Sequence, residues 1–260
     1  MSPDFKSRLR AGRPALCCLL NMASPVAAEI VACAGYDSAM VDLEHGPGDI
    51  PTTLLQLQAL AARGCAGLVR VPANDPVWLK RVLDLGPAGV MVPMVADPAA
   101  AEAAVAACRY PPRGVRGVAH PIARAAAYGA ERAAYVERGE ADLLLICQIE
   151  SPEAVGRAAA IAAVEGVDML FVGPMDLSAA AGHFDQPDAP ALAPLIAEVR
   201  RAAKAAGKLF GLLATPGRPA ARLLAEGTDL VIDAVDVSLL REAAAARLAA
   251  ARPESGPAAG

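Results

Sequence analysis

Eight short apolar segments, separated by longer alanine-rich stretches, are the feature of this chain that most constrains its fold. The segments are continuously apolar rather than alternating, which is typical of strands buried on both faces of a parallel sheet. Several of the stretches between them open with Asp, Ser or Pro and close with Gly, which are helix start and stop signals. The pattern predicts an α/β chain folded as a single (β/α)8 TIM barrel. The predicted strands span residues 16–21, 38–43, 67–71, 89–94, 143–149, 168–173, 208–213 and 229–234.

The length of the chain, 260 residues, fits one such barrel. We expect the barrel domain to span 1–250 and the segment 251–260, ARPESGPAAG, to form a flexible tail. The longest connection, between the fourth and fifth strands, contains the Pro-, Gly- and Arg-rich segment 109–129. A long insertion after a barrel strand lies on the catalytic face, so we expect a lid or substrate loop there, with a decorative loop as the alternative.

The composition of the chain indicates which binding partners and which cellular compartment to expect. The net charge is −4 and aromatic residues make up 3% of the chain, so nucleic acid is not an expected partner. The six cysteines form no Cys-x-x-Cys pair and most lie in apolar runs, which favours reduced core thiols over zinc ligands or disulfides. The first residues lack the apolar core of a signal peptide, and no apolar run is long enough for a membrane span. We therefore expect a cytoplasmic protein.

Polar residues cluster where the predicted strands end, which is where TIM barrels carry their chemistry. Glu150 follows the fifth strand and Asp176 follows the sixth, and Gln148 adds an oxygen donor nearby. Two carboxylates on successive strands could bind one hard divalent cation, and oxygen ligands favour magnesium or manganese over zinc. The alternative is that each carboxylate caps the helix that follows it. Spacing alone leaves both open.

A second polar group follows the second strand, in the segment Glu44-His45-Gly46-Pro47. A histidine at a strand end could act as a general base near neutral pH, although a lone histidine is more often structural. In the turn 173–178 after the sixth strand, backbone N–H groups could face a ligand carboxylate, with an ordinary helix cap as the alternative.

The positions of the lysines bear on the class of mechanism. A Schiff-base aldolase needs a lysine at a strand end inside the barrel. Lys6 precedes the barrel, Lys80 and Lys204 fall in predicted helices, and Lys208 opens the seventh strand on the wrong face. If the chain is an aldolase, a metal ion is therefore expected to take the place of the lysine.

Five segments together resemble the HpcH/HpaI family of metal-dependent (class II) aldolases. Members of this family cleave 4-hydroxy-2-oxo acids to pyruvate, or hydroxypyruvate, and an aldehyde, as 4-hydroxy-2-oxoheptanedioate aldolase does. The resemblance extends from the first predicted strand to the eighth, and its fold is a barrel of the phosphoenolpyruvate/pyruvate type. The matching segments are VDLEHGP (41–47), RVPANDPVWLKRVLDLGPAGVMVPMV (70–95), RYPPRGVRG (109–117), QIESPEA (148–154) and VEGVDMLFVGPMDLSA (164–179).

The resemblance assigns roles that spacing alone does not. It implies that Glu150 and Asp176 are ligands of a divalent cation, Mg²⁺ or Mn²⁺ with Co²⁺ as a further option, and that Gln148 lies beside the metal. It implies that Arg70 holds the 2-oxo oxygen and the enolate formed on it. It also implies that His45 is a base that works through water and is paired with the residue at position 84, Asp84.

The resemblance also implies the substrate contacts and the assembly. The turn Gly173-Pro174-Met175-Asp176 matches the substrate carboxylate site, with the amides of its last two residues as donors. Arg124 is implied to touch the aldehyde half of the substrate. Family members are usually homohexamers, trimers of dimers that exchange their last helix, here LLREAAAARLAA (239–250). The implied partners are therefore a small 2-oxo acid, an aldehyde and further copies of the chain.

Three departures from the family pattern affect the aldehyde specificity. Met175 stands where the family often has Ala, and His120 follows the RGVRG segment where Gly and Ser are common, so that it contacts substrate or caps the loop. The run 182–185 is shorter than the usual Gly-rich one. Two other functions remain open: an acyl-CoA lyase of the citrate-lyase-type barrels, and a barrel without catalytic activity that binds a small acid.

Overall fold

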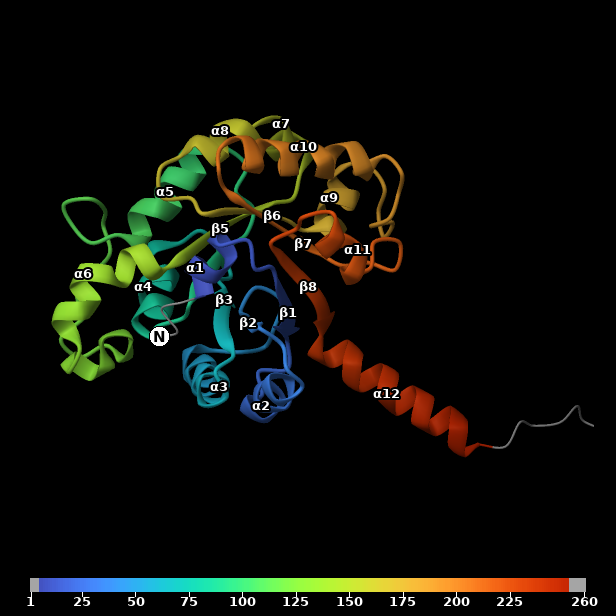
Figure 1. The fold of residues 1–260 in the computed structure, drawn as a ribbon, viewed down its shortest axis with the longest axis horizontal. Coiled ribbons are helices and arrows are strands. Elements are labelled where there is room, and N and C mark those ends of the chain that lie inside the picture. Colours follow the sequence, from blue (N-terminus) through green and yellow to red (C-terminus); the bar gives the residue numbers. More distant parts are fainter. Residues whose placement is uncertain (1–4, 253–260) are drawn as a thin grey trace, which may run out of the picture.

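Eight parallel strands form a closed barrel in which each strand pairs with its neighbours in sequence and β8 pairs with β1 (Figure 1). The computed structural model describes residues 5–252. Every observed strand overlaps a predicted segment, with bounds that differ by at most two residues, so the predicted (β/α)8 barrel is confirmed. The strands are β1 (Ala15–Leu20), β2 (Ser38–Asp42), β3 (Ala66–Arg70), β4 (Gly89–Val92), β5 (Leu144–Ile149), β6 (Met169–Val172), β7 (Leu209–Leu213) and β8 (Leu230–Val235).

Helices connect the strands and cover the outside of the barrel (Figure 1). Ser24, Asp49, Asp75, Asp97 and Ser151 cap five of them, each accepting a backbone N–H with a proline in the first turn, so the predicted start signals act as expected. The helices are α1 (Phe5–Arg10), α2 (Pro25–Cys33), α3 (Ile50–Ala62), α4 (Pro76–Asp84), α5 (Pro98–Cys108), α6 (Arg132–Asp142), α7 (Pro152–Gly156), α8 (Ala158–Ala163), α9 (Pro174–Ala180), α10 (Leu192–Ala205), α11 (Ala220–Ala225) and α12 (Asp236–Ala251), with a 3₁₀ helix η1 (Arg124–Gly129).

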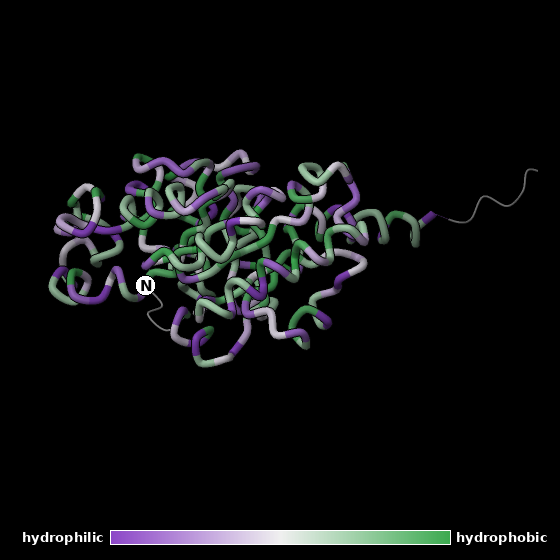
Figure 2. The backbone as a smooth tube through the Cα atoms, turned by 90° about the horizontal axis from the view of Figure 1, so that it is seen from above, coloured by the Kyte–Doolittle hydropathy of each residue, from purple (hydrophilic) through white to green (hydrophobic). Residues whose placement is uncertain are grey.

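Two apolar layers explain why the strands are continuously apolar. Cys17 and Leu19 of β1 belong to the cluster inside the barrel, whereas Cys18 and Leu20 belong to the cluster between the strands and the helices. Both faces of the strand are therefore buried, as expected for a parallel sheet. Figure 2 shows the hydrophobic residues gathered along the central strands and hydrophilic residues along the outer loops.

Helix α1 covers the N-terminal end of the barrel. Phe5 and Leu9 are buried in the inner cluster, and the Lys6 ammonium donates to the carbonyl of Leu143 at 2.9 Å and pairs with Asp168 at 2.8 Å. With this end closed by a helix, the opposite end, where the strands terminate, is the one that can admit a ligand.

The structure corrects the expected position of segment 109–129. We expected it, as a long insertion after a strand, to lie on the catalytic face, but α5 lies between β4 and this segment. Helices in a barrel run antiparallel to its strands, so a segment that follows a helix lies at the N-terminal end. Arg124 of η1 accordingly donates to the carbonyl of Leu85, the C-terminal cap of α4. Within one chain the segment is therefore not a lid over the strand ends.

Helix α12 projects from the barrel rather than packing against it (Figure 1). Only its first residue, Asp236, is buried, and Leu240 and Leu248 are 59% and 51% exposed. The helix ends at Ala251, one residue into the segment predicted as a tail, and residues 253–260 of that segment lie outside the described residues.

Two further features bear on the class of protein. All six cysteines are free thiols, and five of them are buried while Cys33 is exposed, which matches the expectation of core thiols. Within residues 5–252, no helix combines the length and apolarity that crossing a membrane requires.

Candidate active site

A cavity of about 250 Å³ lies at the C-terminal ends of the strands. Phe171, Leu213 and Ile232 give it an apolar wall, and Arg70 and Asp176 face it from the polar side. A larger cavity, of about 410 Å³, lies at the N-terminal end, but it contains none of the residues that follow the strands. The smaller cavity is therefore the candidate active site.

Arg70, the last residue of β3, is held by two carboxylates from the end of β2. Its Nε and Nη2 atoms donate to the two oxygens of Asp42, both at 2.9 Å, and its Nη1 lies 3.0 Å from a Glu44 oxygen. Asp42 and Arg70 are direct partners in the register of β2 and β3, which brings the two side chains together. The two-pronged pairing with Asp42 fixes the plane of the guanidinium where it lines the cavity.

The electrostatics of this pair agree with the geometry. Burial raises the pKa of Asp42, but the hydrogen bonds and the charge of Arg70 outweigh it and leave that pKa below its usual value. Burial lowers the pKa of Arg70, but Asp42 and Glu44 outweigh it and leave that pKa above its usual value. Both groups are therefore charged at neutral pH, and their charges are retained in a buried setting.

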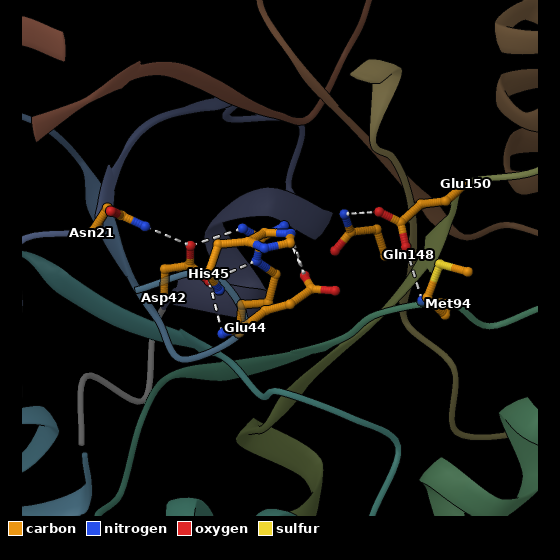
Figure 3. A network of polar contacts seen from close by, with 8 residues as sticks. Asn21, Asp42, Glu44, His45, Met94, Gln148 and Glu150 are labelled. Atoms are coloured by element: carbon orange, nitrogen blue, oxygen red, sulfur yellow. Dashed lines mark hydrogen bonds and ion pairs between the residues drawn. The ribbon is translucent and has the colours of Figure 1, made fainter. Parts of the chain in front are cut away.

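Glu150, directly after β5, is buried and accepts two hydrogen bonds. The amide nitrogen of Gln148 donates to one carboxylate oxygen at 2.5 Å and the backbone N–H of Met94 to the other at 2.9 Å (Figure 3). Met94 has a φ of 54°, uncommon for a residue with a side chain, which orients this N–H towards the carboxylate. Burial, together with the charges of Asp176 and Glu44, raises the pKa of Glu150 to about 7.

The surroundings of Glu150 fit a divalent cation. Negative groups gathered around a buried carboxylate raise its pKa, and a cation would relieve that repulsion. The carbonyl oxygen of Gln148 is buried and accepts no hydrogen bond, so it is free to act as a ligand. Among residues 5–252, no group of three or more His, Cys, Asp or Glu side chains could hold a metal ion. The donors present are two carboxylates and one amide oxygen, a set that suits a hard cation with further ligands from water or substrate.

The turn after β6 contributes backbone groups to the same cavity. Gly173 caps α9 without a side-chain hydrogen bond, and Pro174 has no N–H, so Met175 and Asp176 carry the first amides of the helix. A Cβ at Gly173 would lie 2.8 Å from both the Gln148 amide nitrogen and a Glu150 oxygen. Only glycine lets this turn approach the two side chains so closely.

His45 lines the cavity and is more than half exposed. Its Nε2 lies 3.8 Å from a Glu44 oxygen, and its backbone N–H donates to Asp42 at 3.4 Å. The side chain is thus accessible to solvent and substrate, and Glu44 is the carboxylate beside it.

The structure does not bring three of the predicted site residues to this cavity. Asp84 ends α4, at the N-terminal end of the barrel, and pairs with Arg116 at 2.8 Å rather than with His45. Arg124 donates to the carbonyl of Leu85, and His120 accepts from Arg132 at 3.1 Å. Helix α4 runs opposite to the strands, so within one chain its last residue cannot reach a residue that follows β2.

Two residues that sequence reasoning missed complete the arrangement. Asp42 is the main partner of Arg70, and Asn21, directly after β1, donates to Asp42 at 3.1 Å (Figure 3). A signal for Asp42 was visible, because it is the only charged residue within the apolar segment 38–43. The role of Asn21 depends on the closure of β1 next to β2, which the sequence alone does not display.

All four lysines lie away from this cavity, as expected. Lys6 lies at the N-terminal end, Lys80 and Lys204 lie in helices, and the Lys208 ammonium donates to the carbonyl of Val167.

Residues 16–243 match the family model described as HpcH/HpaI aldolase/citrate lyase. The chain belongs to this family.

Two relatives and one solved structure place the chain within that family. A hydroxypyruvate/pyruvate aldolase of Chromohalobacter salexigens is 44% identical over 87% of this chain and 89% of its own length. A 4-hydroxy-2-oxo-heptane-1,7-dioate aldolase of Salmonella arizonae is 40% identical over 98% of each chain. The crystal structure of a family member from Burkholderia cenocepacia is 38% identical, covers 96% of this chain and 100% of that chain, and superposes with a TM-score of 0.91. These relatives support the aldolase function that the resemblance implied.

Proposed function

We propose that this chain is a divalent-metal-dependent aldolase that reversibly cleaves 4-hydroxy-2-oxo acids to pyruvate, or hydroxypyruvate, and an aldehyde. The observation that carries the proposal is Arg70, a buried guanidinium that lines the same cavity as Gln148 and Asp176. A positively charged guanidinium held beside a set of metal ligands suits a reaction in which negative charge develops on a 2-oxo group. The names of the two relatives support the same substrate class.

The proposed metal ligands are Glu150 and Asp176, with the carbonyl oxygen of Gln148 beside them. Mg²⁺ or Mn²⁺ suits these oxygen donors, and Co²⁺ is a further candidate. When bound, the cation would act as a Lewis acid that polarises the 2-oxo group. The backbone N–H of Met94 and the amide of Gln148 already hold the Glu150 carboxylate in a fixed orientation, so little reorganisation is needed for binding.

Arg70 is proposed to stabilise the oxygen on which charge develops during cleavage. Because Asp42 holds two of its nitrogens, the guanidinium cannot follow the substrate and instead stays at the position where the charge appears. Such a preorganised donor binds the transition state more tightly than the substrate.

His45 is proposed to move the proton. During cleavage its imidazole would accept the proton of the C4 hydroxyl through a water molecule, and during synthesis it would return that proton. Its exposed position at the cavity mouth supports access by water. The backbone N–H groups of Met175 and Asp176, at the start of α9, are proposed to bind the substrate carboxylate.

The remaining roles require a second copy of the chain. Asp84, His120 and Arg124 lie at the end of the barrel opposite to His45, so they can serve this chemistry only in the site of another subunit. Helix α12, which projects with exposed apolar side chains, supports an assembly in which it packs on another subunit. We propose a homo-oligomer, in particular a hexamer built as a trimer of dimers that exchange α12.

The experiment that tests the function is product identification. The protein with Mg²⁺ is incubated with a panel of 4-hydroxy-2-oxo acids and, separately, with acyl-CoA esters, and the products are identified by NMR. Pyruvate or hydroxypyruvate together with an aldehyde, from the first panel only, is the expected result. Cleavage of an acyl-CoA ester instead would replace the proposal with a lyase of the citrate-lyase type, and no cleavage in either panel would favour a small-acid-binding barrel.

A further inference from the structure

A continuous series of hydrogen bonds joins the ends of four neighbouring strands, β8, β1, β2 and β3. The carboxylate of Asp236, which follows β8, accepts the backbone N–H groups of Asn21 at 2.9 Å and Met22 at 3.1 Å. The side chain of Asn21, which follows β1, donates to Asp42 at 3.1 Å. Asp42, the end of β2, accepts the two donors of Arg70, the end of β3, at 2.9 Å.

The two carboxylates of this series are buried, and each accepts several hydrogen bonds. Asp236 is 5% exposed, and it also accepts the backbone N–H of Val237, the second residue of α12. Asp42 is 2% exposed, and the oxygen that accepts from Asn21 is the same one that accepts from the Nη2 of Arg70. Without the Asn21 donor, the Asp42 carboxylate keeps its hydrogen bonds from Arg70 and from the backbone N–H of Glu44, so it is expected to rotate towards them. Arg70, which is paired to both of its oxygens, would then shift with it.

We propose that Asn21 and Asp236 are positioning residues for Arg70. They act through Asp42, and neither lines the cavity, so neither touches the substrate. The proposal rests on the proposed function, because the consequence of positioning Arg70 is loss of activity. It also connects the first residue of the projecting helix α12 to the guanidinium in the active site.

Closure of the barrel between β8 and β1 does not account for this series of hydrogen bonds. The seam between β1 and β8 is already closed by backbone pairing from Ala15 with Leu230 to Leu19 with Val235. The amide of Asn21 is not part of that seam, because its side chain points to β2 (Figure 3). The turn at Gly46 passes close to both residues, since a Cβ there would lie 2.3 Å from the Asp42 carbonyl oxygen and 3.3 Å from that of Asn21. The arrangement therefore fits a role in orienting Asp42.

The chain offers a matched control for the test. Asn74 also donates one side-chain hydrogen bond, to the carbonyl of Ala100 at 2.8 Å, and it lies in the loop after β3 on the same face of the barrel. Asn21→Leu and Asn74→Leu thus make the same change and remove one hydrogen bond each. Only the first removes a donor from Asp42.

In the full-length protein with Mg²⁺, Asn21→Leu is expected to lower kcat about tenfold, because a displaced Arg70 would lose about one charge-assisted hydrogen bond to the transition state. KM should change less than about twofold, because an interaction realised in the transition state lowers kcat rather than substrate binding. Asn74→Leu should leave both constants within about twofold of the wild type. Equal values of kcat in the two variants would overturn the proposal.

A second pair of variants tests the far end of the series and covers a failure of Asn21→Leu to fold. Asp236→Asn replaces one of the two accepting oxygens with a donor, and Asp97→Asn makes the same change at the cap of α5, where Asp97 accepts from Ala100 at 2.8 Å. Asp236→Asn should lower kcat several-fold, and Asp97→Asn should not. In an Arg70→Lys background, Asp236→Asn should have no further effect on kcat, whereas an undiminished effect would show that it does not act through Arg70.

Crystal structures of the variants separate a failure of this proposal from a failure of the proposed function. If the wild type releases no pyruvate, the kinetic comparison is void, but the position of Arg70 can still be observed. Asn21→Leu should show a rotated Asp42 carboxylate and an Arg70 guanidinium displaced from its wild-type plane, while Asn74→Leu should not. An unchanged Arg70 in Asn21→Leu would contradict the proposal whatever the activity of the protein.

Discussion

At the scale of single residues, the candidate site depends on where charged side chains are held rather than on how many there are. Arg70 is fixed by Asp42 and Glu44, and Glu150 is fixed by Gln148 and the backbone of Met94. Both groups are buried. Asp42 and Glu44 keep Arg70 positively charged, and the nearby charges of Asp176 and Glu44 raise the pKa of Glu150. A positively charged guanidinium held in a fixed position, with carboxylates that can bind a metal ion nearby, is what the proposed reaction needs.

Arg70→Lys tests whether the plane of the guanidinium matters. Lysine keeps the charge but cannot donate to both oxygens of Asp42, so kcat/KM should fall by at least about 100-fold. The matched control is Arg63→Lys, in which an exposed arginine paired with Glu29 is changed and activity should be retained. Steady-state kinetics on a 4-hydroxy-2-oxo acid measure both, and near-normal turnover of a folded Arg70→Lys variant would remove Arg70 from the mechanism.

Glu150→Gln tests the proposed metal ligands. Removing the charge of a ligand while keeping its shape should weaken the affinity for Mg²⁺ or Mn²⁺ by at least about tenfold, measured by calorimetry. Glu153→Gln, three residues further on in the first turn of α7 and exposed, should leave the affinity unchanged. Equal cation affinities in the two variants would count against the assigned site.

The residues that sequence reasoning could predict are those at strand ends. Glu150, Asp176 and His45 were predicted from their position after apolar strands, because a parallel barrel brings all strand ends to one edge. The role of Arg70 was implied only by the family resemblance. Asp42 and Asn21 were missed because their importance comes from pairing across neighbouring strands. Local spacing shows a charge within an apolar segment at Asp42, but it does not show which residues of the neighbouring strands pair with it.

At the scale of elements, the bounds of the strands were predicted within two residues, but the segment after α5 was predicted for the wrong end of the barrel. The pattern predicted the strand and the insertion correctly, and the error arose from overlooking that α5 carries the chain back before the insertion begins. The segment is anchored there by Arg116. Its guanidinium lies 4.6 Å from the ring of Tyr110 and 5.8 Å from that of Tyr135, and it pairs with Asp84.

Arg116→Met tests this anchor. The change removes a buried cation from between two rings and leaves Asp84 without its partner, so the free energy of unfolding should fall by about 2 kcal/mol, below the loss for a fully buried pair because Asp84 is partly exposed. Arg113→Met removes an exposed pair with Glu140 and should cost less than about 1 kcal/mol. Urea unfolding measures both, and an equal loss in the two variants would show that Arg116 is not an anchor.

At the scale of the whole molecule, one chain holds the proposed metal ligands, Arg70 and His45 at one edge of the barrel, while three residues implied to serve the reaction lie at the other end. The closed barrel was predictable because eight buried strands leave few alternatives. The residue pattern alone did not predict the direction of α12, because its alanine-rich sequence would suit packing on its own barrel as well as on another. Only the family resemblance implied that the last helix leaves its own barrel.

Substitutions in α12 test the proposed assembly. Leu240→Glu combined with Leu248→Glu places charges on exposed apolar positions, so a helix that packs on another subunit should no longer do so. Sedimentation velocity should show smaller species than for the wild type. Leu55→Glu, at an exposed position of α3, serves as the control. An unchanged sedimentation coefficient for the double variant would contradict a role of α12 in assembly.

The most direct test of the central claim is pyruvate release from a racemic 4-hydroxy-2-oxo acid, coupled to lactate dehydrogenase, before and after treatment with EDTA. We expect release that stops with EDTA and returns when Mg²⁺ or Mn²⁺ is added in excess, because the chain has no lysine in the cavity to act instead. Release that continues unchanged in EDTA, or its absence with every cation, would contradict the assignment of a metal-dependent 2-oxo acid aldolase.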